Sequence, residues 1–205
     1  MIMHRTSKAL VMATVAVVAC LGLFASRAEA TFHLWAIVQV YSNASGSVQF
    51  IELQQPSSEF DDERFVGGLS LTDSALAHSF TFPANLPAAP VANQRFLIAT
   101  PGYAALKGVP APDYTLAAND FFSTSGDTLT YAGGVNSLTF SGSQLPTNGV
   151  DALFRAYGAS TFTTGKNSPT NFAGQTGSVS VPEPATVGVV AVAMGLGLLR
   201  RRKVS

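Results

Sequence analysis

Short apolar segments separated by Gly, Pro, Asn, Ser and Asp fill the chain between residues 34 and 181. Several segments place apolar residues at alternate positions, as Leu69 with Leu71 and Phe80 with Phe82 do. Such alternation is typical of strands that bury one face, and the region has no amphipathic helix of convincing length. We therefore predict an all-β fold, with a sandwich of two sheets preferred to a barrel. The expected strands are Leu34–Val40, Val48–Gln54, Phe65–Leu71, His78–Phe82, Arg95–Thr100, Thr128–Tyr131, Ser137–Phe140, Val150–Tyr157 and Gly177–Val181.

The segments between these strands carry further local predictions. Asn43-Ala44-Ser45-Gly46 is a tight-turn sequence, which predicts that the first two strands form a hairpin. A short helical turn is expected near Tyr103–Lys107. Residues 161–180 are rich in Thr, Ser, Gly and Asn, so we predict a flexible stalk that follows a domain of residues 31–160. The alternative for residues 161–180 is a last, irregular edge strand.

The C-terminal end combines Pro182-Glu183-Pro184, an apolar run over residues 185–199 and a basic cluster over residues 200–203. At 1.5 Å per residue the apolar run makes a helix of roughly 22 Å, which spans a membrane core only with some thinning or snorkelling. The cations stay on the cytoplasmic side, which places everything before Pro182 on the opposite side. Pro182 and Pro184 end the helix there.

This trio resembles the PEP-CTERM sorting signal of Gram-negative bacteria that make extracellular polysaccharide. The resemblance covers residues 181–205 and implies an exosortase, a membrane cysteine protease, as a partner during export. It also implies that Pro182, Glu183 and Pro184 form the processing site. The alternative is a plain membrane anchor that is never cut, and both interpretations place the preceding domain outside the cytoplasm.

Residues 1–30 have the pattern of a secretory signal peptide. A basic start precedes an apolar run over residues 9–25, and Ala28-Glu29-Ala30 has the small-x-small form of a signal peptidase site. We expect signal peptidase to cleave before Thr31. A lipoprotein cleaved before Cys20 is the alternative, because a loose lipobox precedes that residue.

Removing both ends changes the charge of the chain. Residues 31–181 contain five cations and ten anions, a net charge of −5. An acidic surface repels phosphate backbones, which argues against a nucleic-acid partner. The one cysteine, Cys20, lies in the signal peptide, so the mature chain has no disulfide and no Cys-type metal site. Roughly 150 residues can bury a sufficient core without covalent cross-links.

Three stretches of the domain, taken in order, resemble a lamin-tail-like domain, the immunoglobulin-like β-sandwich of nuclear lamins and of many secreted bacterial proteins. They are Phe50-Ile51-Glu52-Leu53, then Gly68–Asp73 with Phe80–Pro83, then Phe96–Ala99 with Ser125–Leu129. The resemblance implies a binding or scaffolding module and carries over no catalytic residue.

The sequence marks no catalytic, cofactor or metal-binding residues. The acidic run Glu59–Glu63 lacks the Gly-punctuated pattern of a calcium loop, so a solvated loop is preferred to a weak Ca²⁺ site. His33 and His78 have no second ligand at metal spacing and are expected to be structural. No Gly-x-Ser-x-Gly elbow or paired-carboxylate motif indicates a hydrolase. We therefore predict a protein that is not an enzyme.

Exposed aromatic side chains would support a different function, because they stack on sugar rings. The candidates are Trp35, Tyr41, Tyr103, Tyr114 and Tyr157. Trp35 lies in an apolar run and is expected in the core, and Phe121-Phe122 is expected to plug one end of the sandwich. Our first hypothesis is a non-enzymatic exported protein with a structural or adhesive role at the cell surface or in the exopolysaccharide matrix. The alternative is an extracellular carbohydrate-binding module.

Overall fold

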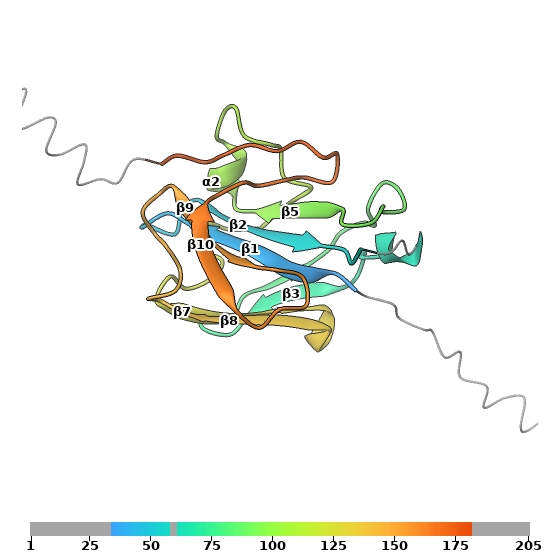
Figure 1. Cartoon of the computed structure of the whole chain (residues 1–205), viewed down its shortest axis with the longest axis horizontal. Helices are drawn as coiled ribbons and strands as arrows, with labels where there is room; N and C mark the ends of the chain where they lie inside the picture. Colours follow the sequence, from blue (N-terminus) through green and yellow to red (C-terminus); the bar gives the residue numbers. More distant parts are fainter. Residues whose placement is uncertain (1–33, 58–60, 182–205) are drawn as a thin grey trace, which may run out of the picture. The chain divides into compact units, whose positions relative to one another are not determined.

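The structure, a computed structural model, describes residues 34–57 and 61–181, and these residues form two β-sheets (Figure 1). The larger sheet has six strands in the order β10-β9-β1-β2-β5-β6, and the smaller has four in the order β4-β3-β7-β8. The strands are β1 (Ala36–Ser42), β2 (Gln49–Gln54), β3 (Ser70–Asp73), β4 (Ser79–Thr81), β5 (Arg95–Ala99), β6 (Tyr114–Thr115), β7 (Gly126–Tyr131), β8 (Asn136–Ser141), β9 (Asp151–Arg155) and β10 (Phe162–Lys166). The all-β prediction is confirmed.

The local predictions agree with the structure where the sequence pattern is strong. Eight of the nine predicted strands overlap observed strands, and β1 and β2 form the predicted antiparallel hairpin. The predicted helical turn is α2 (Pro101–Ala104), a few residues earlier than expected. It begins there because Thr100 caps it: the Thr100 side chain accepts a hydrogen bond from the Tyr103 backbone N–H. Two short 3₁₀ turns, η1 (Asp61–Arg64) and η2 (Ala132–Gly134), complete the described elements.

The main core lies between the two sheets. Ile51, Leu53 and Phe96 contribute from the larger sheet, and Leu71 and Leu129 from the smaller one, all fully buried. These residues occupy alternate positions of their strands, as the period-2 pattern requires. Arg155 of β9 ties the layers together, because its guanidinium donates to the carbonyl of Ile37 in β1 and to the carbonyl of Ser137 in β8.

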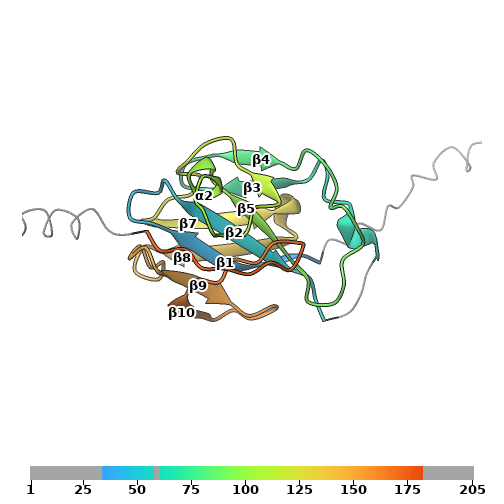
Figure 2. The same cartoon turned by 90° about the horizontal axis from the view of Figure 1, so that it is seen from above.

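The prediction of a flexible stalk over residues 161–180 is wrong. Residues 162–166 form β10, which pairs with β9 along its whole length, so the edge-strand alternative holds for this part. Residues Asn167–Val181, named here the covering segment, then cross the outer face of the larger sheet, reverse direction at Asn171–Gly174 and return. Figure 1 shows this segment on the side of the larger sheet opposite β7 and β8, and Figure 2 shows it passing over β1.

The covering segment gives the larger sheet a second, smaller core. On the outer face, Tyr41, Phe50, Leu97 and Ala99 form a buried cluster with Val179 of the covering segment. Every residue of β1 is buried as a result, on both faces of the strand. The last predicted strand, Gly177–Val181, is the returning part of this segment and belongs to neither sheet.

Candidate functional site

The predicted processing residues lie outside the described part of the chain. This holds for Ala28, Ala30 and Thr31 at the first predicted cleavage site and for Pro182, Glu183 and Pro184 at the second. What the structure does place is Val181, the residue directly before the triplet. Among the described residues, no helix is long and apolar enough to cross a membrane.

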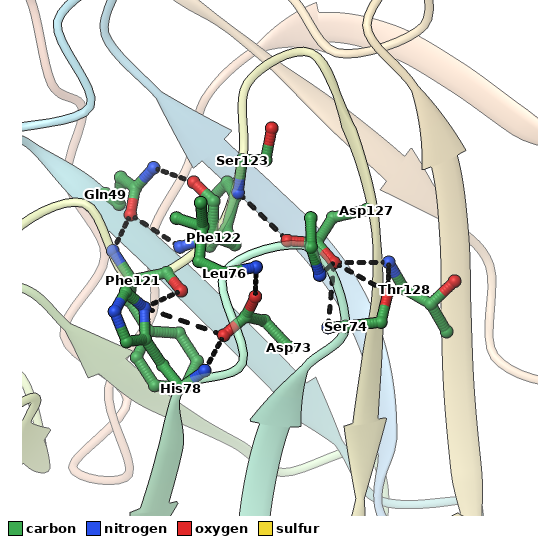
Figure 3. A network of polar contacts seen from close by, with 11 residues as sticks. Gln49, Asp73, Ser74, Leu76, His78, Phe121, Phe122, Ser123, Asp127 and Thr128 are labelled. Atoms are coloured by element: carbon green, nitrogen blue, oxygen red, sulfur yellow. Dashed lines mark hydrogen bonds and ion pairs between the residues drawn. The ribbon is translucent and has the colours of Figure 1, made fainter.

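Two aspartates organise a polar network at one end of the sandwich, where β3, β4 and β7 meet (Figure 3). Asp127 accepts hydrogen bonds from four backbone N–H groups, those of Ser74, Ala75, Ser123 and Thr128. Asp73 accepts from the backbone N–H groups of Leu76 and His78 in the loop from β3 to β4. Both carboxylates therefore close loops by accepting from the main chain.

The same network holds the two adjacent phenylalanines inside the fold. Gln49 accepts from the backbone N–H groups of Phe121 and Phe122 and donates to the Phe122 carbonyl. His78 donates from Nδ1 to the Phe121 carbonyl, at 2.9 Å, and its ring stacks on the Phe121 ring. Both phenylalanines are buried, in agreement with the prediction that they plug the end of the sandwich.

His78 and Asp73 are the nearest approach to a catalytic arrangement in this network. The His78 Nδ1 lies 3.6 Å from the Asp73 carboxylate, beyond hydrogen-bond distance, because its proton is donated to the Phe121 carbonyl. The neighbouring hydroxyl is not available as a nucleophile, because Ser74 Oγ donates to Asp127 and accepts from the Thr128 N–H. The arrangement therefore serves loop geometry. No group of three or more His, Cys, Asp or Glu side chains among the described residues can hold a metal ion.

The second polar cluster lies beneath the covering segment. Three side chains, two on strands of the larger sheet and Asp113 directly before β6, accept hydrogen bonds from the backbone N–H groups of alternate residues in its outgoing part. Ser168 N–H donates to Gln39 Oε1 at 3.1 Å, Thr170 N–H to Glu52 Oε2 at 2.6 Å, and Phe172 N–H to Asp113 Oδ2 at 2.9 Å. These side-chain acceptors satisfy N–H groups that a neighbouring strand would otherwise pair.

Glu52 is the most unusual residue of this cluster, because its carboxylate is completely buried. Arg95 Nη1 donates to Glu52 Oε1 at 2.6 Å from the adjacent strand. A bulge in β1 between Ile37 and Gln39 brings Gln39 opposite Glu52 on the covered face. Burial raises the pKa of Glu52 to about 7, since loss of hydration outweighs the attraction of Arg95 and the Thr170 N–H.

Asp113 joins the covering segment to the edge of the larger sheet. Its Oδ2 accepts from the backbone N–H of Leu97 in β5, at 2.8 Å, and from that of Phe172. Burial raises the pKa of Asp113, against the effect of these two hydrogen bonds. The Phe172 side chain is buried and belongs to the main core cluster. Asp113 therefore holds the covering segment at Phe172, where the segment reverses direction.

The aromatic candidates for sugar stacking are mostly interior residues. Trp35, Tyr41, Tyr103 and Tyr114 are buried, and each donates a hydrogen bond to a backbone carbonyl. Tyr157 is the exposed member, at 38%, and its hydroxyl donates to the Leu34 carbonyl. The described residues thus leave one of the five candidates, Tyr157, on the surface.

The acidic run Glu59–Glu63 differs from a fully solvated loop. Glu63 is completely buried and accepts from the backbone N–H of Leu34 at 2.8 Å, while its carbonyl accepts from the Trp35 indole N–H. Its carboxylate therefore anchors the start of the domain. Glu59 of this run lies outside the described residues, as does His33.

Sequence reasoning missed the Glu52 cluster, although one signal was present. Glu52 stands among Phe50, Ile51 and Leu53, so apolar residues occupy both faces of the strand around it. An acid inside a strand that is apolar on both faces indicates burial with a partner. Comparison with protein-family models found no match for this chain, and comparison with curated proteins found none either.

Proposed function

We propose that this chain is a non-enzymatic bacterial protein, exported and sorted to the outer surface or the exopolysaccharide matrix, where its domain has a structural or adhesive role. The observation that carries the proposal is the sequence of the two ends: a signal peptide before Thr31, and Pro182-Glu183-Pro184 followed by an apolar run and basic cluster. The described part of the domain between them reaches Val181, directly before the triplet.

The fold supports a scaffolding module of the lamin-tail-like, immunoglobulin-like type. The three stretches that resemble this family fall on β2, on β3 with β4, and on β5 with β7. Of these strands, β2 pairs with β5 in the larger sheet, and β3 pairs with β4 and β7 in the smaller one. The polar side chains that an enzyme would direct at a substrate are here committed to backbone groups, as Asp73, Asp127 and Gln49 are. Such a domain is suited to binding or scaffolding through its surface, and not to catalysis.

Export requires signal peptidase at Ala28-Glu29-Ala30 and an exosortase at the triplet. Before the second cut, the apolar run over residues 185–199 holds the chain in the membrane. That cut breaks one peptide bond near the triplet: the acyl group of the domain passes to water or to an acceptor nucleophile, and the C-terminal fragment leaves as a free amine. The trimmed domain then remains at the surface or in the matrix.

Mass spectrometry of both termini tests this proposal. The full chain is produced in its host and in a matched strain that lacks the exosortase. We expect a protein that begins at Thr31 in both strains, and a C-terminus near Pro182–Pro184 only where the exosortase is present. A C-terminus at Ser205 in both strains would contradict the sorting function and leave a plain membrane anchor.

A further inference from the structure

The covering segment fixes the chain immediately before the triplet. Val181 N–H donates to the Gly149 carbonyl at 3.0 Å, which also accepts the Tyr41 hydroxyl. Two residues earlier, Val179 exchanges hydrogen bonds with the Asn167 side chain, at 2.6 and 2.7 Å, and is 1% exposed. The last three residues before Pro182 are therefore part of the folded domain.

Gly149 shows how closely the end of this segment fits. Its φ is +76°, and a Cβ added there would lie 2.0 Å from the Val181 carbonyl oxygen. No side chain fits in that space unless Val181 moves. The conformation and the close approach together require glycine at this position.

A protease needs more free chain than this arrangement leaves. Proteases bind their substrates extended, with main-chain hydrogen bonds on both sides of the bond to be cut. From Val181 to Pro184 the chain reaches at most about 11 Å at 3.3–3.6 Å per residue. The main chain of Val179 and Val181 is already hydrogen-bonded within the domain. The residues on the domain side of the triplet are thus occupied.

We propose that exosortase processing requires Val179–Val181 to detach from the domain, so that the folded domain slows its own release from the membrane. This inference rests on the proposed sorting function. The outgoing part of the covering segment stays in place during detachment, because Gln39, Glu52 and Asp113 hold it independently. Cleavage then follows the population of the detached state.

The size of the effect follows from the contacts that break. Detachment breaks three hydrogen bonds, and each contributes a factor of about 2 to 10 to the equilibrium between the attached and detached states. Detachment also exposes the Val179 side chain to water. The conformational entropy that the freed residues regain opposes both effects. With each bond near the middle of this range, we expect the attached state to be favoured by about tenfold once the regained entropy is subtracted.

Two variants test the inference in the full chain, in a host that carries the exosortase. The first inserts six Gly and Ser residues between Val181 and Pro182, which frees the triplet without changing the domain. The second is Gly149→Ala, which displaces Val181. Gly158→Ala is the matched control, because Gly158 has a φ of +74° and open space around its Cβ position. Pulse-labelling gives the half-time for conversion to the trimmed form.

We expect the insertion and Gly149→Ala to shorten the half-time on the order of tenfold, and Gly158→Ala to match the wild type. Equal half-times for the wild type and the insertion variant would overturn the inference while leaving the sorting function intact, even if Gly149→Ala fails to fold. If no variant is trimmed and all end at Ser205, the sorting function itself fails, and the inference with it.

Discussion

Replacing Glu52 with Gln tests whether burial or ion pairing governs the carboxylate beneath the covering segment. Glu52 is fully buried, yet Arg95 and the Thr170 N–H both donate to it at 2.6 Å. Gln has nearly the same shape and stays uncharged at every pH. A comparison of the two proteins therefore isolates the cost of ionising this one group.

The expected magnitude follows from the pKa. The folded-state pKa of Glu52 is about 7, above its ordinary value of 4.5, so the folded protein binds this proton more tightly than the unfolded chain does. The protonated Glu52 therefore contributes its full share of the folding free energy below about pH 4.5, and this contribution is lost as the pH rises through 7. At ~1.4 kcal/mol per pKa unit, the difference between the ordinary pKa of 4.5 and the folded-state pKa of about 7 corresponds to about 3 kcal/mol of folding free energy.

Urea unfolding of residues 31–181 between about pH 4 and pH 8 measures this effect. The free energy of unfolding of the wild type, relative to Glu52→Gln, should fall by about 3 kcal/mol across that range. Asp120→Asn is the control, because Asp120 is an exposed carboxylate outside the cluster. A difference that stays constant with pH, or that grows as the pH rises, would show that Arg95 outweighs desolvation and would refute the reasoning.

Three further substitutions test the other contacts. Arg155→Met should lower the free energy of unfolding by about 2–4 kcal/mol, because it leaves carbonyls of both sheets without their donor, whereas the exposed Lys166→Met should change it by less than ~0.5 kcal/mol. Asp127→Asn should cost about 1–3 kcal/mol and speed hydrogen exchange at the amides it accepts; unchanged exchange would contradict its loop-closing role. Phe172→Ala should cost about 3 kcal/mol or more in a denaturation experiment, whereas the exposed Val91→Ala should cost little. Equal, small effects at Phe172 and Val91 would restore the stalk interpretation.

The sequence pattern was sufficient where local signals decide the structure. The β1–β2 hairpin follows from two apolar segments around Asn43–Gly46, and the strands with alternating residues, such as β4 and β5, lie close to where they were expected. The pairing of β1 with β9, and of β3 with β7, was not predictable in the same way. Those partners are distant in the sequence, and their choice depends on how the whole core packs.

The covering segment was missed for a physical reason. Its residues have the Thr, Ser, Gly and Asn composition of a linker, and only Phe172 and Val179 are large apolar residues that become buried. It is held by acceptors on other elements and by its own Asn167 and Asn171 side chains, which satisfy backbone groups along its path. Composition and periodicity carry no signal for such contacts, since they depend on which side chains the fold brings beneath the segment.

The covering segment also explains why the prediction of Tyr41 as a candidate for stacking on sugars is wrong. On a two-layer sandwich, alternate residues of β1 and β2 would face solvent, and Tyr41 and Phe50 would be free to stack on a ligand. With a third layer above the sheet, both rings are interior and stack on each other at 5.2 Å. The domain therefore extends at least to Val181, the residue directly before the predicted sorting signal. A chain ended at residue 160 would expose this apolar face to water and would leave Glu52 without the hydrogen bond from the Thr170 N–H. The segment whose composition resembles a linker is therefore required for the stability of the sheet that precedes it.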